Sequence, residues 1–278
     1  FSPFEDLGPF TDPEIIRVTR ALLDAELNLQ LSSQVSLAEK VDGGIRLLWK
    51  DAQGMEHEGV FEQVLVAAGR RPQLRGLGLE NTGLSLDARG FPAWDATTTQ
   101  AGNLPIFVAG DVSGHRPLLH EASDEGRIAG ANAAAYPDLT AHVRRVPLAV
   151  AFTDPNMAMV GASFASLEPG SFEVGEVSFA NQGRARVIGR NHGLLRVYGD
   201  RKCCTIIGAE MIGPRAEHLA HLLAWSVQQG MSVNRALQMP FYHPVIEEGL
   251  RTALRDLASK LRIRGQCASQ DMSTSPGM

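Results

Sequence analysis

The apolar run LPIFVAGDV, residues 104–112, constrains the fold of this chain more than any other stretch. It lacks the polar–apolar alternation of a half-exposed strand, and so predicts a buried strand of a parallel sheet that ends at Gly110-Asp111. In open parallel sheets, ligands bind at the carboxyl ends of strands. A glycine there lets a ligand approach the backbone, and an aspartate accepts hydrogen bonds from sugar hydroxyls. A second interpretation, that Asp111 only starts a turn, is equally compatible with the sequence.

A second apolar run, VLVAAGRRP at residues 64–72, predicts another buried strand, which ends at Gly69. The glycine would allow a nucleotide to lie close to the backbone, whereas Arg70 and Arg71 are typical of a solvated strand end. We favour a crossover between two domains here, with a minor contribution to a ligand site.

The segments around these two runs predict an α/β chain. The sequence TDPE at residues 11–14 is a capping box with a proline in the first turn, so a helix is expected to start there and end near Leu27. Three short strands are expected at residues 34–41, 45–50 and 59–61, with hairpin turns between them. Residues 118–137 predict a helix rich in small residues, which suits close packing on a sheet or a ligand.

Beyond Pro147 the pattern changes to that of an antiparallel α+β unit. Strands are expected in AFTDPNMAMVGAS, GEVSF, RARVI, GLLRVYGD and CTIIGAEMIG, and helices in AEHLAHLLAWSVQQG and after FYHP. The last residues, 263–278, are polar and serine-rich, which is typical of a disordered tail.

The stretch FYHPVIEEGL, residues 241–250, carries the strongest candidate for acid–base chemistry. Pro244 favours an extended conformation for His243 and suits the first turn of a helix, and Glu247 and Glu248 lie about one turn inside that helix. A ring held in this way can give one nitrogen to a carboxylate and turn the other outward, as an oriented general base does. Taken alone, the stretch is also explained as a helix boundary with glutamates that complement the helix dipole.

Composition and charge argue against several classes of function. Hydrophobic residues make up 44% and charged residues 21%, an ordinary globular balance in a chain long enough for roughly two domains. The net charge of −5 does not indicate nucleic-acid binding. No apolar run reaches the roughly 18 residues of a membrane helix. The cysteines, Cys203, Cys204 and Cys267, form neither a disulfide framework nor a metal-binding spacing, so a reducing cytoplasmic compartment is expected.

Four motifs, taken in order, resemble one family of enzymes. VLVAAGRRPQLRGLGLE, then IFVAGDV followed by LLHEASDEG, then FTDPNMAMVG, then FYHPVIEEG are similar to the C-terminal half of the pyridine nucleotide–disulfide oxidoreductases. This family includes the dihydrolipoamide dehydrogenases, which are the nearest in pattern, and the glutathione reductases. The resemblance extends from Phe1 to about Arg262, and four motifs in the same order make it far more specific than any one of them.

The resemblance implies that the chain contributes to an FAD site and to an NAD or NADP site. Asp111, next to Gly110, would hold the ribityl chain of FAD, and Leu119 and His120 would lie beside the flavin ring through their backbone. The nicotinamide cofactor would be approached by Gly69 and would have its adenine near Val35. Ser2 occupies the place of the acidic residue that grips the ribose of NAD, which leaves NAD and NADP both open.

The resemblance also implies a catalytic role and a domain order. His243, polarised by Glu248, would be the acid–base that serves the redox disulfide of the partner subunit in a homodimer. The fold would be α/β, with residues 1–63 as the second half of the NAD(P)-binding domain and 64–144 as the C-terminal part of the FAD-binding domain. Residues 145–262 would form a dimerisation domain of antiparallel sheet and helices, ahead of the tail at 263–278.

Three features of the family are absent from this sequence: a glycine-rich flavin fingerprint, a Cys-x4-Cys redox pair and a second glycine-rich loop for the nicotinamide cofactor. The family pattern places all three upstream of Phe1, so we expect the chain to be the C-terminal part of a longer enzyme. The 278-residue chain alone is expected to show no disulfide reductase activity and no tight binding of FAD.

The expected function is the transfer of electrons between a dithiol and NAD(P) through flavin, with dihydrolipoamide, free or on a lipoyl-bearing protein, as the favoured dithiol. Mercuric reductases and the soluble transhydrogenase are alternatives within the family. Both usually lack a histidine before the proline of the last motif, so His243 favours a dithiol–disulfide substrate. An alternative of another class is a non-catalytic dimerisation module.

Overall fold

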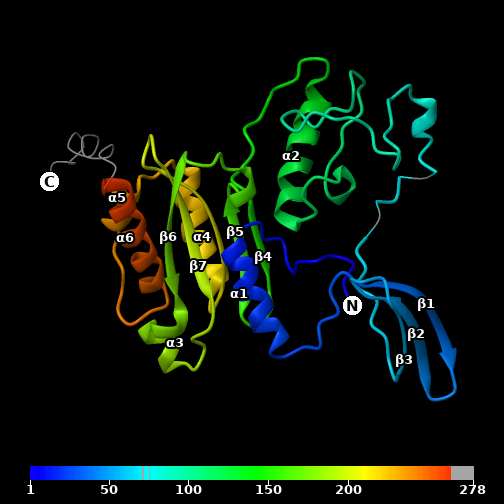
Figure 1. Ribbon diagram of the computed structural model, residues 1–278. Coiled ribbons are helices and arrows are strands. Elements are labelled where there is room, and N and C mark those ends of the chain that lie inside the picture. The colour runs from blue at the N-terminus through cyan, green and yellow to red at the C-terminus, as the bar shows by residue number, and fades with distance from the viewer. Residues whose placement is uncertain (71, 75, 264–278) are drawn as a thin grey trace. The chain divides into compact units, whose positions relative to one another are not determined.

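The computed structural model describes residues 1–70, 72–74 and 76–263 (Figure 1). The chain divides into two compact units. The first combines Phe1–Val64 with the chain from Val146 onward, and the second is Leu65–Arg145. Residues 1–63 and 145–262, which the resemblance assigned to two different domains, therefore fall almost entirely within one unit. The predicted tail at 263–278 lies outside the described residues, except for Ile263, which is the last residue of a helix.

A five-stranded antiparallel sheet forms the centre of the first unit. Its strands are β4 (Leu148–Ala151), β5 (Asn156–Gly161), β6 (Phe172–Ser178), β7 (Leu194–Asp200) and β8 (Ile206–Gly213), in the order β4-β5-β8-β7-β6. The central pairing sets Leu195 opposite Met211 and Val197 opposite Ala209, and all four side chains are fully buried. Successive residues of a strand point to opposite faces, so this register gives the sheet two distinct apolar faces.

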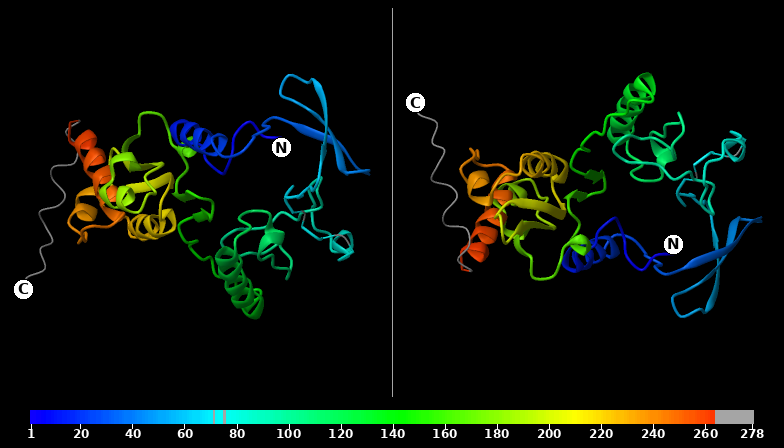
Figure 2. Two further views of the ribbon diagram at one scale, coloured as in Figure 1. Left: turned by 90° about the horizontal axis from the view of Figure 1, so that it is seen from below. Right: turned by 90° about the horizontal axis from the view of Figure 1, so that it is seen from above.

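Helices cover both faces of this sheet. One face packs against α4 (Ala216–Gln228), α5 (Val233–Leu237) and α6 (Glu247–Ile263) in the larger apolar core. The other face carries Met157 and Ile212, which pack against Phe10 and Ile15 of the segment that contains α1 (Pro13–Asp24). Figure 2 shows α1 and α4 on opposite sides of the sheet. The unit is therefore layered as helix, sheet and helix.

Gly175, on β6, has no side chain and so lets the backbone of α6 pack directly against the backbone of this strand. A Cβ built on Gly175 would lie 2.2 Å from the carbonyl oxygen of Ala253 and 2.4 Å from the Cβ of Leu257. Any larger residue would push α6 away from the sheet. This contact sets the distance between α6 and the sheet. It thereby also positions the loop with His243, which leads into α6.

The first unit also contains a three-stranded antiparallel sheet, β1 (Gln34–Val41), β2 (Gly44–Lys50) and β3 (Glu56–Phe61), in sequential order. The sequence located β1 and β2 to within a residue, and placed the start of β3 three residues too late. On this sheet, the ring of Trp49 lies 4.8 Å from that of Phe1 and 5.6 Å from that of His57, centroid to centroid.

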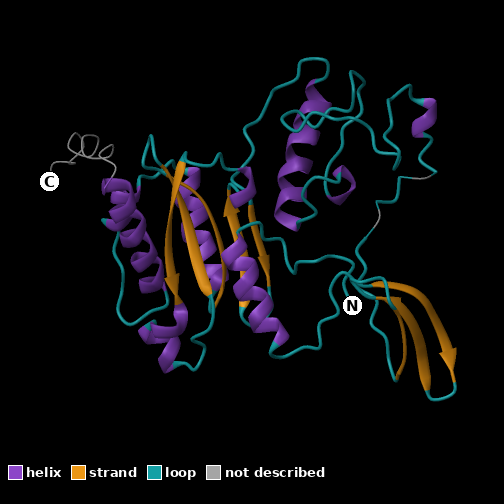
Figure 3. Ribbon diagram, in the orientation of Figure 1, coloured by secondary structure: helices purple, strands orange, loops and turns teal. Residues whose placement is uncertain are grey.

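The second unit is built around α2 (Leu119–Ala135), with the short helices η1 (Leu79–Asn81) and η2 (Asp111–Ser113). Figure 3 shows that loops make up most of the rest. The two strands predicted at 64–72 and 104–112 are wrong for the residues described there: the only pairing is an isolated bridge between Gln100 and Phe107. A strand needs hydrogen-bonded neighbours along its length, whereas in the described residues Ile106 and Val108 bond only to Ala101 and Thr99, around that single bridge. Leu65 and Val66, expected to be buried, are consequently 92% and 79% exposed.

Two further predictions are corrected by local hydrogen bonds. The stretch RARVI is not a strand but lies in α3 (Gly183–Val187), because Gln182 caps this helix by accepting from the N–H of Ala185. Helix α1 is capped by Asp12, not Thr11, and ends at Asp24 rather than near Leu27. The hydroxyl of Thr11 instead donates to Glu210 at 2.7 Å. The remaining short helices are η3 (Phe164–Ser166) and η4 (Phe179–Asn181).

A buried polar cluster joins α1 to the five-stranded sheet. Glu210 on β8 is fully buried, and its carboxylate accepts from the N–H and hydroxyl of Thr11 and from the N–H groups of Asp12 and Phe164. Asp12 in turn accepts from the hydroxyl of Tyr198 at 2.9 Å and pairs with Arg196 at 3.1 Å. Burial, together with the carboxylates of Glu210 and Asp12, raises the pKa of Tyr198, so its hydroxyl stays protonated as a donor.

None of the described helices is long and apolar enough to cross a membrane.

Candidate active site

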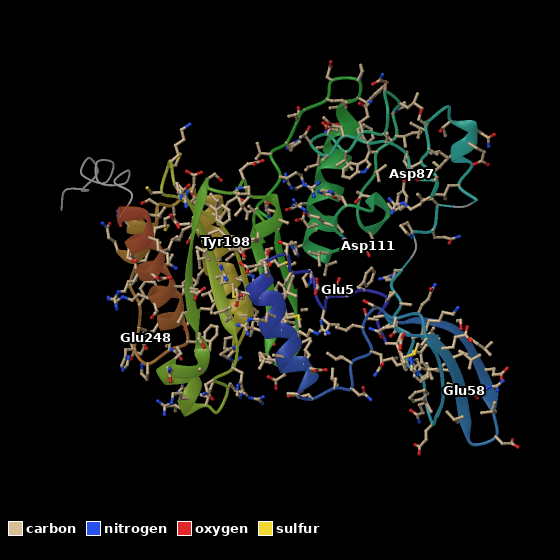
Figure 4. All side chains as sticks on the ribbon, viewed as in Figure 1. Glu5, Glu58, Asp87, Asp111, Tyr198 and Glu248 are labelled. Atoms are coloured by element: carbon tan, nitrogen blue, oxygen red, sulfur yellow. The ribbon has the colours of Figure 1, made fainter. Side chains whose placement is uncertain are left out.

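Glu248 belongs to the first turn of α6 (Figure 4). His243 lies in the loop before that helix, four residues ahead of its first residue, Glu247. The Nδ1 atom of His243 is 2.9 Å from Oε1 and 3.0 Å from Oε2 of Glu248. The N–H of Val245 donates to Oε2 at 3.3 Å, so backbone and ring together hold the carboxylate. The hydrogen bond with His243, and secondarily that with Val245, lowers the pKa of Glu248. The carboxylate is therefore charged at neutral pH.

The pair leaves one ring nitrogen for a substrate. With Nδ1 donating to Glu248, Nε2 carries the lone pair and can accept a proton. The side chain of His243 is 79% exposed, so Nε2 is accessible. Glu247 cannot take the place of Glu248, because adjacent helical residues point about 100° apart, and Glu247 lines a different surface. The arrangement can perform general acid–base chemistry.

That other surface is an apolar groove of about 470 Å³ between α4 and the segment that leads to His243, here called the aromatic groove. Its lining includes Leu222, Trp225, Met239, Phe241 and Tyr242. Trp225 is 67% exposed and Tyr242 is 79% exposed. Large aromatic side chains held in contact with water favour a partner surface, because burying them releases ordered water.

In the second unit, Gly110 and Asp111 form a turn in a conformation that other residues rarely adopt. Gly110 has φ 81° and ψ −162°, a region that is essentially restricted to glycine. Its N–H donates to Oε2 of Glu125 at 2.7 Å, and its carbonyl accepts from the N–H of Ser113 at 2.8 Å. The carboxylate of Asp111 is about half exposed, with Arg70 at 3.8 Å. The turn thus presents a carboxylate to solvent.

The carboxylate of Glu125 belongs to a buried ion cluster. Arg144 pairs with Glu125 at 3.0 Å and with Glu121 at 2.7 Å, and Arg116 also reaches Glu121, at 3.2 Å. Burial alone would raise the pKa of Glu121, but the hydrogen bonds from Arg144 and Arg116 outweigh it and lower the pKa. Both carboxylates of this cluster, Glu121 and Glu125, therefore have a guanidinium partner.

The other residues implied by the resemblance are distributed over both units. Leu119 and His120 are the exposed first residues of α2, and Leu118, at the N-cap, gives this helix no side-chain cap. Gly69 is exposed with φ 86°, next to Arg70 and in the same unit as Asp111. Val35 lies on β1, in the first unit. His243 and Glu248 belong to the same unit but to a different segment, at the start of α6. The structure thus brings together the proposed flavin residues in one unit, and the acid–base pair in the other.

Sequence reasoning missed Glu125 and Arg144. The acidic stretch HEASDEG, within a helix rich in small residues that packs closely, is the sequence feature that indicates a buried carboxylate. The partner of each carboxylate is distant along the chain, and no spacing rule identifies it.

Comparison with known proteins places these residues in a family. The model of the pyridine nucleotide-disulphide oxidoreductases matches residues 4–126, and that of the dimerisation domain of the same enzymes matches residues 147–254. A dihydrolipoyl dehydrogenase from Thermus scotoductus is 32% identical over 258 residues, covering 91% of this chain and 55% of that protein. The mitochondrial dihydrolipoyl dehydrogenase of Rattus norvegicus is 32% identical over 251 residues, covering 87% and 48%.

Solved structures share the fold. LpdA from Mycobacterium tuberculosis superposes with a TM-score of 0.76 at 24% identity, covering 91% of this chain and 55% of that one. The flavoprotein disulfide reductase RclA from Escherichia coli gives 0.75 at 20% identity, covering 92% and 57%. The α/β fold class predicted from the sequence is confirmed. The chain spans about half the length of the curated relatives it matches. From its first strands to its last helix, this chain belongs to the pyridine nucleotide-disulphide oxidoreductase family.

Proposed function

We propose that this chain supplies the C-terminal part of an FAD-dependent enzyme of the dihydrolipoyl dehydrogenase type, which passes electrons between a dithiol and NAD(P). The observation that carries the proposal is the pair of His243 and Glu248, 2.9 Å apart, with the second ring nitrogen exposed. The similarity to dihydrolipoyl dehydrogenases favours a dithiol, small or carried on a lipoyl-bearing protein, over a metal ion as the substrate.

The role of the pair follows from proton balance. Oxidation of a dithiol to a disulfide releases two protons and two electrons, and the thiolate is the nucleophile of disulfide exchange. Nε2 of His243 accepts the proton of one substrate thiol, and the resulting thiolate would attack the redox disulfide of the partner subunit, breaking its S–S bond and releasing one cysteine as a thiolate. The second substrate thiol, on losing its proton, would displace the other cysteine and close the substrate disulfide. Glu248 stabilises the positive charge that then appears on the ring. A bound flavin would relay the electron pair from the reduced cysteines to the nicotinamide.

The turn at Asp111 fits a flavin. Its carboxylate is half exposed and can accept a hydrogen bond from a ribityl hydroxyl, and the glycine conformation at Gly110 keeps side-chain atoms away from the approach. Leu119 and His120, at the uncapped start of α2, would contact the flavin ring through their backbone. We assign Gly69 and Val35 to the NAD(P) side, without a choice between the two nucleotides.

We further propose that the enzyme is a homodimer joined through the dimerisation domain, with the aromatic groove in the contact. The match of residues 147–254 to the dimerisation domain of the family and the exposed Trp225 and Tyr242 support this. A purely structural role as a dimerisation module is disfavoured, because such a module has no need of an oriented histidine. A cytoplasmic location is part of the proposal and rests on the cysteine pattern alone.

The test is the thiol half-reaction of the full-length protein. His243→Gln should slow flavin reduction by the dithiol by about a hundred- to ten-thousand-fold, the usual contribution of a general base. Hydride exchange between flavin and nicotinamide should change little, because it needs no thiol base. Rapid-mixing absorbance measurements separate the two. Glu247→Gln is the matched control and should leave both rates unchanged. Intact dithiol oxidation in His243→Gln would mean that the FYHP stretch is only a helix boundary.

A further inference from the structure

The carboxylate of Glu125 is the most tightly enclosed ionised group near the proposed flavin turn, and the proposed chemistry does not use it. Glu125 has no exposed surface, and one of its oxygens, Oε2, accepts from the backbone N–H of Gly110 at 2.7 Å. Its other oxygen, Oε1, accepts from Arg144 at 3.0 Å. A buried charge persists only with such partners, and the hydrogen bonds it makes are among the strong ones.

Glu125 contacts Gly110, the residue directly before Asp111. The conformation of Gly110, φ 81° and ψ −162°, is open to glycine but to few other residues, and glycine also has many alternatives to it, so neighbouring groups must select it. On one face of α2, Ala122 and Glu125 are one turn apart. The Cβ of Ala122 would lie 3.5 Å from a Cβ built on Gly110, and Glu125 grips the Gly110 amide. The helix therefore fixes the peptide between Ala109 and Gly110, from which the backbone runs through one residue to Asp111.

Arg144 makes this grip rigid. Its guanidinium bridges Glu125 and Glu121, also one turn apart on α2, and its Nη1 donates to the carbonyl of Ala96 at 3.4 Å. Glu125 therefore cannot swing towards water without breaking the cluster. The neighbouring Asp124 pairs with Arg145 instead, at 3.2 Å.

We propose that Glu125 is a positioning residue for flavin binding: it holds the amide of Gly110 and thereby aims Asp111 at a ribityl hydroxyl. The inference rests on the proposed function, because it takes Asp111 as the residue that contacts FAD. Glu125 touches no cofactor itself and acts only through the turn.

The first experiment measures the turn without any flavin. In the 278-residue chain, Glu125→Gln keeps the shape of the side chain but removes the charge, so hydrogen exchange of the Gly110 amide should accelerate roughly ten-fold or more, as expected for the loss of a hydrogen bond to a charged acceptor. Asp124→Asn is the matched control and should leave that exchange rate unchanged. An unchanged rate in Glu125→Gln overturns the inference, whatever FAD does.

The second experiment measures the dissociation constant of FAD for the full-length apoprotein. Glu125→Gln should weaken binding by roughly ten- to a hundred-fold, and Asp124→Asn should not. Because Glu125 acts through Asp111, the double variant Asp111→Asn with Glu125→Gln should bind no more weakly than Asp111→Asn alone. Additive losses would mean that Glu125 only supports the fold, and would overturn the inference.

The outcomes separate the two proposals. If Asp111→Asn leaves FAD binding unchanged, the assignment of Asp111 in the proposed function fails, and the positioning role fails with it. If Asp111→Asn weakens binding but Glu125→Gln does not, only the positioning role is wrong. Should Glu125→Gln melt well below the wild-type chain, Glu125→Asp serves in its place: it keeps the charge but withdraws it from Gly110, and should give the same coupling to Asp111.

Discussion

At the scale of single residues, the proposed acid–base role of His243 depends on the charged carboxylate of Glu248 beside it. Glu248 accepts from the ring of His243 and from the N–H of Val245, and these bonds lower its pKa. Glu248→Gln keeps the shape and one acceptor but loses the charge. The rate of flavin reduction by the dithiol should therefore fall, but by less than in His243→Gln. Rapid-mixing measurements on both variants test this, and a larger loss from Glu247→Gln than from Glu248→Gln would show that the pairing is misassigned.

Asp95 offers a prediction about pH. Its Oδ1 accepts from the hydroxyls and N–H groups of Thr97 and Thr98, and these bonds, the Thr97 hydroxyl first, lower its pKa from 3.8 to about 2. A folded-state pKa below the unfolded one gives stability that is present above the unfolded pKa and lost as the pH falls through the folded pKa. The stability that Asp95 adds over Asp95→Asn should therefore shrink as the pH falls from about 4 to 2. Urea unfolding followed at neighbouring Trp94 measures it, and a difference independent of pH would refute the assignment.

At the scale of elements, the seating of α6 on β6 depends on Gly175. A Cβ there would lie 2.2 Å from the backbone oxygen of Ala253, which cannot rotate away as a side chain can. Gly175→Ala should therefore cost about 1–3 kcal/mol or more in the free energy of unfolding, as overpacking does. Gly183→Ala in α3 is the matched control, since nothing lies within 4 Å of the added Cβ. Denaturant unfolding of both variants distinguishes them, and equal stability would mean that α6 is not seated at this depth.

Elements whose determinants are local could be predicted from the sequence, and those that depend on distant partners could not. The strands β1 and β2 were located because alternation and the turn at residues 42–43 act over a few residues. The apolar runs at 64–72 and 104–112 read as strands by composition, but a strand forms only against a neighbour. The same distinction holds within the candidate site. His243 and Glu248 are five residues apart, so their spacing indicated the pairing, whereas Glu125 lies 15 residues from Gly110.

At the scale of the whole molecule, the proposed role of the aromatic groove in the homodimer contact can be tested by one substitution. Trp225→Glu places a charge on the apolar surface of α4 and should convert dimers of the full-length protein to monomers at micromolar concentration, because a charge without a partner in a contact is costly. Val187→Glu is the matched control, since Val187 is an exposed apolar residue of α3 outside the groove lining. Sedimentation velocity measures the outcome. If the dimer survives Trp225→Glu, the subunits meet elsewhere.

The cluster at Glu210 has a consequence for dividing the protein into parts. A piece cut to begin at Val146 would keep all five strands of the sheet and every helix of its larger core. It would nevertheless leave the Glu210 carboxylate with Phe164 as its remaining donor, since the other three belong to Thr11 and Asp12. Met157 and Ile212 would be uncovered at the same cut. The two stretches are far apart in sequence but form one folding unit, so a stable excised dimerisation domain would have to carry α1 with it, joined by a linker or supplied as a separate peptide.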